Sequence, residues 1–284
     1  MAYIPHGRIE YFIGEDVPYL DLTSHVLGIA DTTGEMEYFT REACVVAGID
    51  EAARVAETLG CDAEPLVAAG DAVAAGDSLL RVRGSADALH KTWKVGLNLL
   101  DHLSAIATKT RQMVDAVHAV APGCEVLTTR KSMPGVKDLI TEAVVLGGAY
   151  PHRLGLSETV LVFDQHIEFM GGLDAFIDQI PVLRRRCIEK KFFVESTVEN
   201  ALRLASAGVD GIQFDKASPD EIARLVPGLR TINPRITLIA AGGVNLGNAA
   251  EYAKTGIDGI ATTSPLSAKP LDMSVRMIPL PDTV

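Results

Sequence analysis

The sequence is poor in cysteine and in long apolar runs, and each shortage argues against a class of protein. Its four cysteines are spread over 284 residues without a Cys-x-x-Cys pair: Cys44, Cys61, Cys124 and Cys187. This spacing argues against a disulfide framework or a zinc site and is typical of reduced thiols in the cytosol. No run approaches the ~18 apolar residues of a membrane span, and the first residues lack the basic and apolar regions of a signal peptide. We therefore expect a cytoplasmic protein that does not bind membranes.

Positive charge is scarce as well. Lys and Arg number 26 against 37 Asp and Glu, which gives a formal net charge of −11. Nucleic acids and anionic membranes attract clustered Lys and Arg, so this balance argues against both as partners. An anionic ligand therefore requires a local basic pocket. The 48% of hydrophobic and 22% of charged residues are ordinary for a globular protein, and the length suits one large domain or two smaller ones.

Several widespread motifs are absent from the sequence. It has no Gly-x-Gly-x-x-Gly after the first strand of its C-terminal half, no P-loop lysine signature and no Gly-x-Ser-x-Gly. Its seven histidines include no His-x-x-x-His pair. These absences count against a dinucleotide-binding sheet, a serine hydrolase and a structural metal site.

The first ~105 residues have a mixed pattern. Helical spacing of apolar residues predicts a helix over Thr40–Leu59, and Gly70–Asp71 and Gly76–Asp77 predict tight turns between short strands. The strand and turn pattern resembles the barrel-sandwich of lipoyl and biotinyl carriers. A swinging-arm carrier needs a lysine at a hairpin tip, and none occurs between Leu59 and Arg81. We therefore interpret this part as a β-rich module of a larger enzyme.

A long helix is expected over Leu89–Val120, and from Cys124 onward strands and helices alternate. The expected strands are Glu125–Thr129, Thr159–Phe163, Phe192–Glu195, Gly211–Phe214, Leu238–Ala241 and Gly259–Thr262. The expected helices between them are Leu173–Glu189, Val198–Ala207, Pro219–Leu225 and Leu246–Thr255. This alternation predicts a parallel sheet, either a compact and incomplete α/β barrel or, as the competing interpretation, a doubly wound open sheet.

Charged and phosphate-compatible residues follow the expected strands. They are Arg130–Lys131, Asp164–Gln165–His166, Glu195, Asp215–Lys216, Gly242–Gly243 and Ser264, with His152 and Arg153 on a further loop. Active sites of α/β barrels form at the carboxyl ends of the strands, so this distribution predicts an enzyme.

Three groups of these residues suggest a chemistry. Arg130–Lys131 and His152–Arg153 could bind carboxylates or phosphates, although solvated loop charges are the alternative. Glu195 and Asp215 could bind Mg²⁺, hold ribose hydroxyls or stabilise a cationic transition state, unless they are ion-pairing partners at the rim. Gly242–Gly243, before a helix expected from about Asn245, could cradle a phosphate or form a plain turn.

The ordered motifs along nearly the whole chain carry a family resemblance. They are GEDVPYLDLTS, HKTWKVGLNLLDHLSAIAT, TTRKSMPG, GGAYPHRLGL, LVFDQHIEF, VES, FDK and AAGGVN. With them the chain resembles the quinolinate phosphoribosyltransferase family (nicotinate-nucleotide pyrophosphorylase, carboxylating), and most closely its ModD-type branch associated with molybdenum transport.

The resemblance implies a fold and a domain organisation. The fold is α/β, with an N-terminal α/β sandwich domain over residues 1–107 and an open, incomplete seven-stranded TIM-like α/β barrel over residues 108–269. The segment 270–284 is expected to pack back on the first domain. The resemblance also implies a homodimer or a dimer-based oligomer with sites at the subunit interface.

The implied reaction transfers phosphoribosyl from phosphoribosyl pyrophosphate (PRPP) to quinolinate with Mg²⁺, which yields nicotinate mononucleotide, pyrophosphate and CO₂. Carried over by motif, the catalytic residues are Lys131, Glu195 and Asp215, of which Glu195 and Asp215 also serve Mg²⁺. The substrate-binding residues are Lys94, Arg130, His152, Arg153, Phe163, Gly242, Gly243, Thr263 and Ser264. Lys94 would reach the partner's site.

Four positions depart from the family pattern. Phe163 stands where Lys-Asp-Asn-His motifs carry lysine, and Lys94 where an interfacial arginine is usual. Thr128 replaces an aspartate, and Thr263 replaces a glycine near the last phosphate loop. Quinolinate carries two carboxylates, and losing a buried cation would weaken its binding by on the order of 2–5 kcal/mol. The acceptor is therefore quinolinate or a related planar acid.

Two alternatives stay open beside a phosphoribosyltransferase. One is a non-catalytic protein that binds an anionic ligand linked to molybdenum transport. The other is an unrelated barrel enzyme, such as an aldolase with Lys131 or Lys216 as the Schiff-base lysine.

Overall fold

The computed structural model describes residues 3–281 and divides into two compact units. The first takes in the chain up to Arg111, the segment Met133–Gly148 and the chain from Ser267 onward; the second comprises Gln112–Ser132 and Ala149–Leu266. Residues 1–2 and 282–284, at the ends of the expected segments 1–107 and 270–284, lie outside the described part.

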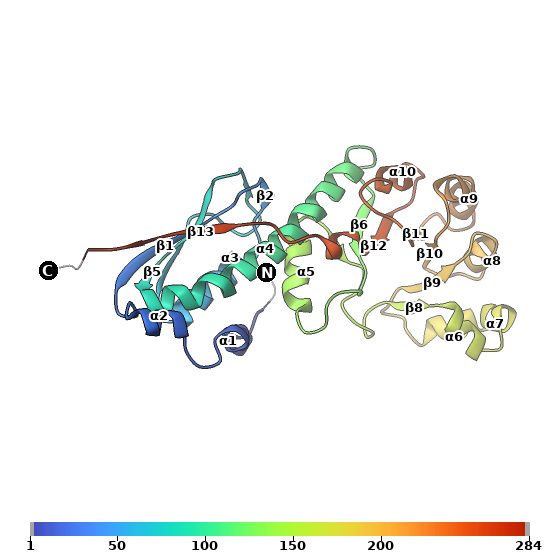
Figure 1. Ribbon diagram of the computed structural model, residues 1–284. Helices are drawn as coiled ribbons and strands as arrows, with labels where there is room; N and C mark the ends of the chain where they lie inside the picture. The colour runs from blue at the N-terminus through green and yellow to red at the C-terminus, as the bar shows by residue number, and fades with distance from the viewer. Residues whose placement is uncertain (1–2, 282–284) are drawn as a thin grey trace. The chain divides into compact units, whose positions relative to one another are not determined.

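The first unit is built on an antiparallel sheet with strand order β13-β1-β5-β3, of which β13, β1 and β5 are labelled in Figure 1. Its strands are β1 (Thr33–Phe39), β3 (Asp62–Pro65), β5 (Ser78–Ser85) and β13 (Ser274–Pro279), with a separate pair β2 (Cys44–Val45) and β4 (Ala72–Val73). Its helices are α1 (His6–Asp16), α2 (Leu22–Leu27), α3 (Ile49–Thr58), α5 (Lys137–Leu146) and most of α4 (Ala86–His118). Apolar residues of β1, β5, α3 and α4 form its core, including Met36, Leu80, Ala52 and Leu100.

The segment Met133–Gly148 joins the first unit through α5. A Cβ on Gly147 would lie 2.4 Å from Cβ of Thr110, and Nη2 of Arg111 donates to the carbonyl of Leu146 at 3.2 Å. Arg8 and Asp138 form an ion pair at 3.6 Å. The expected boundary after residue 107 stays a prediction, since the division by contacts does not follow it.

The helix expected over Thr40–Leu59 is wrong in its first half. The helix α3 begins only at Ile49, after Gly48 in the left-handed region at φ +80°. Upstream, the backbone N–H of Val45 donates to Oγ1 of Thr108 at 2.9 Å and that of Ala47 donates to Oγ of Ser104 at 3.0 Å. Hydroxyls of α4 thus hold this segment extended, a tertiary effect that overrides the helical spacing.

The two expected Gly-Asp turns are confirmed. Gly70 and Gly76 adopt φ of +94° and +95°. Oδ2 of Asp71 accepts from the N–H of Ala68 and Oδ2 of Asp77 from that of Ala74, both at 2.8 Å. The aspartate bonds close each turn while glycine supplies the left-handed residue.

The second unit is an open sheet of seven parallel strands, which confirms the expected incomplete α/β barrel (Figure 1). In spatial order the strands are β7 (Tyr150–Pro151), β6 (Glu125–Thr128), β12 (Gly259–Thr262), β11 (Thr237–Ala241), β10 (Gly211–Asp215), β9 (Phe192–Ser196) and β8 (Val160–Val162). The connecting helices are α6 (Asp164–Phe169), α7 (Leu173–Arg185), α8 (Ala201–Ser206), α9 (Pro219–Ile232) and α10 (Ala249–Ala253), followed by the 3₁₀ turn η1 (Ser264–Ser267). All six expected strands are present, and β7 and α6 are additional.

Alternate residues of each parallel strand point to opposite faces of the sheet. The inner face carries an apolar cluster to which five strands contribute: Leu161, Phe193, Ile239, Ala241 and Ala261 are buried, with Leu127 and Phe163 packed against them. Parallel registry places Leu161 beside Phe193 and Ala261 beside Leu127. The polar residues of the candidate site follow this apolar cluster along the strands.

The four cysteines are free thiols, as their spacing predicts. In the described range 3–281, no helix has the length and apolar character that crossing a membrane demands.

Candidate active site

The inner face continues beyond the apolar cluster into polar residues at the carboxyl ends of the strands. Steps of two along a strand lead from Leu161 to Phe163, from Phe193 to Glu195, from Gln213 to Asp215 and from Ala261 to Thr263. Because a step of two keeps a strand residue on the same face, these side chains belong to one surface.

Eleven of the twelve predicted site residues belong to the second unit. They are Arg130, Lys131, His152, Arg153, Phe163, Glu195, Asp215, Gly242, Gly243, Thr263 and Ser264. The twelfth, Lys94, is an exposed residue of α4 in the first unit, where its Nζ lies 5.3 Å from the centroid of the Trp93 ring.

Three cations of the site form no salt bridge within the described residues. Among residues 3–281, no salt bridge involves Arg130, Lys131 or Arg153. Burial lowers the pKa of Arg153, and the positive charge of Arg130 lowers it further, so the two guanidinium groups repel each other. Like charges held together without salt bridges are typical of a site that binds an anion.

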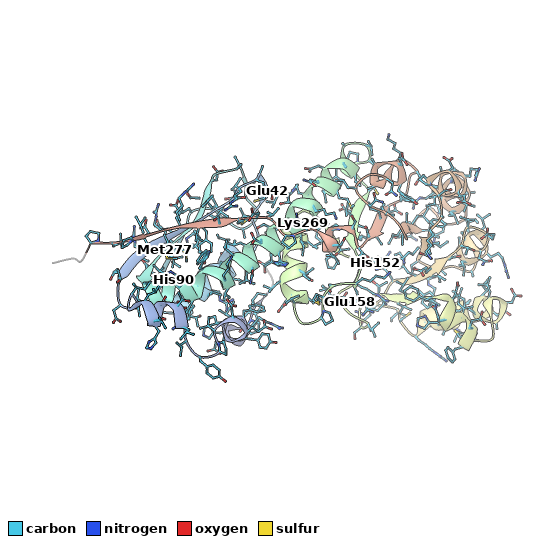
Figure 2. The ribbon with its side chains drawn as sticks, in the orientation of Figure 1. Glu42, His90, His152, Glu158, Lys269 and Met277 are labelled. Carbon is cyan, nitrogen blue, oxygen red and sulfur yellow. The ribbon has the colours of Figure 1, made fainter. Side chains whose placement is uncertain are left out.

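Histidine 152 follows β7 and is labelled in Figure 2. Its backbone N–H donates to the carbonyl of Thr128 at 2.9 Å, and its ring meets Phe193 edge-on with centroids 6.4 Å apart. Burial lowers the pKa of His152, and Arg153 adds to the effect. The imidazole is therefore largely neutral near pH 7 and can donate a hydrogen bond without adding charge.

Glu195 and Gln213 are neighbours in the parallel registry of β9 and β10. Nε2 of Gln213 donates to Oε2 of Glu195 at 2.5 Å. Burial raises the pKa of Glu195, the Gln213 hydrogen bond opposes that rise, and Asp215 and Asp164 raise it further while Lys131 lowers it. The carboxylates of Asp215 and Asp164 and the ammonium of Lys131 are therefore all close enough to Glu195 to change its pKa.

Phe163 follows β8 and precedes α6. Its ring packs partly buried against the inner-face cluster, and Cζ of Arg153 lies 5.8 Å from the ring centroid. His166 lies in α6, and its ring centroid is 5.8 Å from that of Phe163. Nδ1 of His166 accepts a hydrogen bond from the backbone N–H of Phe163 at 3.0 Å. An aromatic wall therefore stands directly beside a site cation.

The turns after β10 and β11 fit closely together. Gly242 has φ +79°, and a Cβ there would lie 2.6 Å from Oδ1 of Asp215 and 2.8 Å from the backbone N of Lys216. Lys216 itself has φ +57°, and its N–H donates to the carbonyl of Ala241 at 2.9 Å. Glycine is required at 242 because any side chain would strike the neighbouring strand end.

The expected helix start near Asn245 is wrong, since α10 begins at Ala249. Side-chain amides of Asn245 and Asn248 instead donate to the carbonyl of Gly243 at 3.1 and 3.2 Å and hold the preceding loop. Gly243 has φ +81° and open space at its Cβ position. A phosphate cradle here would rely on loop N–H groups, because α10 is too short to add a strong dipole.

The remaining residues lie at the ends of β6 and β12. Oγ1 of Thr129 and Oγ1 of Thr263 are 2.8 Å apart, and the backbone N–H of Ser264 donates to Oγ1 of Thr262 at 3.0 Å. The hydroxyls of Thr129 and Thr263 continue the polar inner face, whereas Thr262 points to the opposite face, where its Oγ1 donates to the carbonyl of Val244. Thr129 was not among the predicted site residues.

Gln213 and Asp164 were also missed as site residues. The signal for Gln213 is a polar side chain inside the otherwise apolar strand Gly211–Phe214, where it is buried at 7% exposure. A buried amide needs a hydrogen-bond partner, and the registry supplies Glu195. Asp164 directly follows an expected strand, so its position was visible although its effect on Glu195 was not.

The expected Mg²⁺ site and the Schiff-base alternative can both be compared with this geometry. In the described part of the chain, no three His, Cys, Asp or Glu side chains group as a metal site. Magnesium commonly takes one or two carboxylates together with substrate phosphates, so the Glu195–Asp215 pair fits an ion that arrives with its substrate. A Schiff-base lysine is desolvated, whereas the side chain of Lys216 is 80% exposed.

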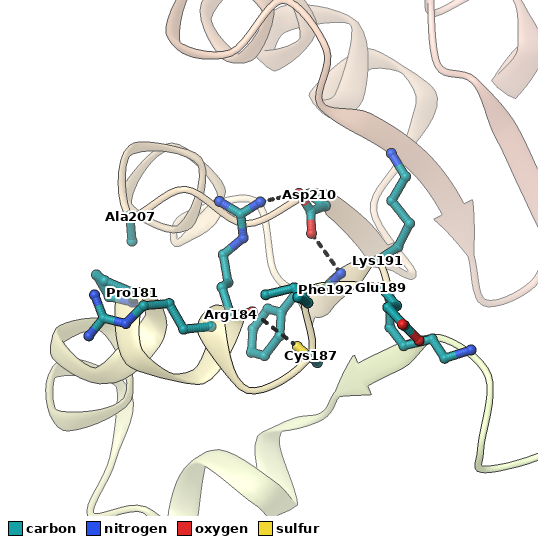
Figure 3. A pocket seen from close by; sticks show the side chains of 11 residues that line it. Pro181, Arg184, Cys187, Glu189, Lys191, Phe192, Ala207 and Asp210 are labelled. Carbon is teal, nitrogen blue, oxygen red and sulfur yellow. Dashed lines mark hydrogen bonds and ion pairs between the residues drawn. The ribbon is translucent and has the colours of Figure 1, made fainter.

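A cavity of about 610 Å³ lies at the amino ends of β9 and β10 (Figure 3). Nη2 of Arg184 bonds Oδ1 of Asp210 at 2.5 Å, and Oδ2 of Asp210 accepts from the N–H of Phe192 at 2.9 Å. No predicted site residue lines this cavity. The basic residues that line this cavity are Arg184, Arg185, Lys190 and Lys191. They lie at the opposite end of the strands from the candidate site.

Family models match both parts of the chain. The model "Quinolinate phosphoribosyl transferase, N-terminal domain" matches residues 21–104, and "Quinolinate phosphoribosyl transferase, C-terminal domain" matches residues 106–276.

Similar proteins carry related names. The "Putative pyrophosphorylase ModD" of Rhodobacter capsulatus is 42% identical over 257 residues, covering 90% of this chain and 98% of that protein. The "Probable nicotinate-nucleotide pyrophosphorylase (carboxylating)" of Synechocystis sp. is 33% identical, covering 95% and 91%. The crystal structure of NadC from Streptococcus pyogenes superposes with a TM-score of 0.87 at 27% identity, covering 97% of this chain and 96% of that one.

Proposed function

Since the chain belongs to the quinolinate phosphoribosyl transferase family, we propose that it transfers phosphoribosyl from PRPP to a small planar acid, either quinolinate or a related acceptor, with release of diphosphate. The observation that carries the proposal is a set of cations that form no salt bridge, Arg130, Lys131 and Arg153, at the carboxyl ends of the same sheet whose strands β9 and β10 carry Glu195 and Asp215. PRPP brings several phosphates, and the reaction develops positive charge on the ribose. A site of this kind needs cations for the first and carboxylates for the second.

The residues divide the work by charge. Arg130 and Lys131 bind the diphosphate, and Lys131 offsets the negative charge that grows on the leaving oxygen. Glu195 and Asp215 stabilise the oxocarbenium-like ribose. The neutral His152 and the Arg153 guanidinium orient the carboxylate of the acceptor.

Three further elements complete the proposed site. Gly243 and its loop, with Thr263 and Ser264, receive the 5′-phosphate. Glu195 and Asp215 would hold Mg²⁺, which neutralises diphosphate charge when bound. Glu195 is half-buried, which limits the water near the ribose carbon, where water would compete with the acceptor.

We further propose a homodimer or dimer-based oligomer in which Lys94 of one chain serves the partner's site. In the first unit, the stretch around α2 exposes large apolar side chains at more than half of their surface: Tyr19, Leu20, Leu22, Val26 and Leu27. Large apolar side chains exposed along one short stretch of chain support a protein interface. Free cysteines are in keeping with a cytoplasmic location.

Diphosphate release is the direct test. With PRPP, Mg²⁺ and a panel of pyridine and azole acids, we expect turnover that Lys131→Ala lowers by about 10²–10³-fold in kcat/KM. Lys254→Ala, an exposed lysine at the end of α10, is the matched control and should retain the wild-type rate. The absence of diphosphate release with every acid, together with no calorimetric binding of PRPP, would contradict the proposal.

The second candidate function is anion binding without chemistry, which the unpaired cations and Phe163 also permit. It predicts that a small anion such as molybdate binds and that Lys131→Ala weakens this binding, with no diphosphate release on any acceptor. Turnover that depends on Lys131 eliminates it.

A further inference from the structure

We propose that the acceptor is a planar aromatic acid with a single carboxylate, and that Phe163 excludes diacids. This inference rests on the proposed phosphoribosyl transfer and names the substrate class of the same site. It follows from the contacts around Arg153 and Phe163 at the ends of β7 and β8.

The Phe163 ring has a defined position in the site. Phe163 extends the inner-face cluster formed by Leu161, Phe193 and Ala241, so its ring is an apolar part of the site wall. The ring is partly exposed, and the Arg153 guanidinium carbon lies 5.8 Å from its centroid. A flat ligand that reaches Arg153 therefore also meets an aromatic surface, to which a second ring can stack or pack edge-on.

The groups around Arg153 differ in charge. His152, the other neighbour of Arg153, is kept largely neutral because burial lowers its pKa. Arg130 and Lys131 follow β6, and the charge of Lys131 acts on Glu195, whose pKa it lowers. The cation in contact with the Phe163 ring is Arg153, with Arg130 near enough to lower its pKa, and one guanidinium binds one carboxylate in a bidentate pair.

A second carboxylate on the ligand would meet the Phe163 ring. Against the Phe163 ring it would gain no hydrogen bond from that apolar side chain, and a desolvated anion without a partner is strongly disfavoured. A ring carbon bearing only hydrogen meets no such penalty. The geometry thus selects one acid group and an unsubstituted ring edge.

The reaction with such an acceptor balances without loss of carbon. The lone pair of a ring nitrogen forms the bond to C1 of the ribose, while the bond from C1 to the diphosphate oxygen breaks and leaves its electron pair on diphosphate. The single carboxylate remains on the ring, bound to Arg153. Carbon dioxide, which a pyridine diacid would release from its second carboxylate, is not formed.

The test compares pyridine-3-carboxylate with pyridine-2,3-dicarboxylate in the full-length protein. With PRPP and Mg²⁺, we expect kcat/KM for diphosphate release to be at least ~10-fold higher with the monoacid. Phe163→Lys supplies a cation for the second carboxylate and should shift the ratio at least ~10-fold toward the diacid. Phe163→Leu, the uncharged control, should keep the preference for the monoacid.

Calorimetry with the two acids alone measures the same preference without turnover, and far-ultraviolet circular dichroism confirms that each variant is folded. A wild-type preference for the diacid in rate or binding, or a ratio unchanged in folded Phe163→Lys, overturns the inference and leaves the phosphoribosyl transfer intact. Failure of PRPP to bind, with no diphosphate from either acid, removes the proposed transfer instead.

Discussion

At the scale of single residues, Glu195 is the group whose ionisation the site controls most directly. Burial raises the pKa of its carboxyl, and the neighbouring charges of Asp215 and Asp164 raise it further against the opposing Gln213 hydrogen bond. A raised pKa means that the folded state binds this proton more tightly than the unfolded chain does. The stabilisation by that proton is present at low pH and is lost as pH rises through the folded-state pKa.

Removing one of the like charges should show this coupling. In Asp215→Asn we expect the pKa of Glu195 to fall, because a negative neighbour that disfavours the carboxylate is gone. A titration of the Glu195 side-chain carbonyl carbon by nuclear magnetic resonance measures the change. Asp164→Asn is the matched control and should lower the pKa by less, since Asp164 contributes less than Asp215. An unchanged or raised pKa in Asp215→Asn would contradict the coupling.

At the scale of elements, the site depends on how the inner faces of neighbouring strands fit. Gly211 opens β10 opposite Phe193 of β9, and a Cβ on Gly211 would lie 2.2 Å from Cε1 of Phe193. The Phe193 ring in turn meets His152 edge-on. The missing side chain at Gly211 therefore leaves room for the aromatic floor of the site.

We expect Gly211→Ala to lower the free energy of unfolding by about 1–3 kcal/mol, because the added methyl forces Phe193 out of its packed position. Urea denaturation followed by circular dichroism gives the value. Gly155→Ala, whose Cβ would meet nothing within 4 Å, serves as the control and should stay within about 0.5 kcal/mol of wild type. Equal stability of the two variants would show that the strands adjust freely.

At the scale of the whole molecule, the proposed dimer makes each site a product of two chains. Lys94 lies in the first unit, whereas Lys131 lies in the second with the other predicted site residues. If Lys94 serves the partner's site, two inactive variants can complement each other, because one of the two sites in a mixed dimer receives both lysines.

Co-expression of Lys94→Ala and Lys131→Ala chains should thus recover about a quarter of the wild-type sites, since half of randomly formed dimers are mixed and each holds one intact site. The measurement is diphosphate release from the co-purified protein. Lys131→Ala with Glu195→Gln is the control pair, and it should stay inactive because both residues belong to the same site. A Lys94→Ala mixture that also stays inactive argues that Lys94 does not act across an interface.

The sequence by itself determined the parallel barrel strands and most of the polar residues at their ends. Buried parallel strands such as Leu238–Ala241 are continuous apolar runs, and strand ends such as Arg130–Lys131 and Glu195 interrupt them with charge, so both are visible in local order. The Gly-Asp turns were equally legible, because their geometry depends on residues next to each other in the chain.

Tertiary structure decided what depends on partners far apart in sequence. Residues Thr40–Gly48 have helical spacing but are not helical, because hydroxyls of α4 bind the backbone N–H groups of Val45 and Ala47. Gln213 gains its role only through registry with Glu195. The same holds for Arg153 and Phe163, whose contact sets the character of the acceptor wall. The alternation of residues along a strand determines which face of the sheet a side chain lies on. Its charge state and its contacts depend on other strands, which only the tertiary structure brings side by side.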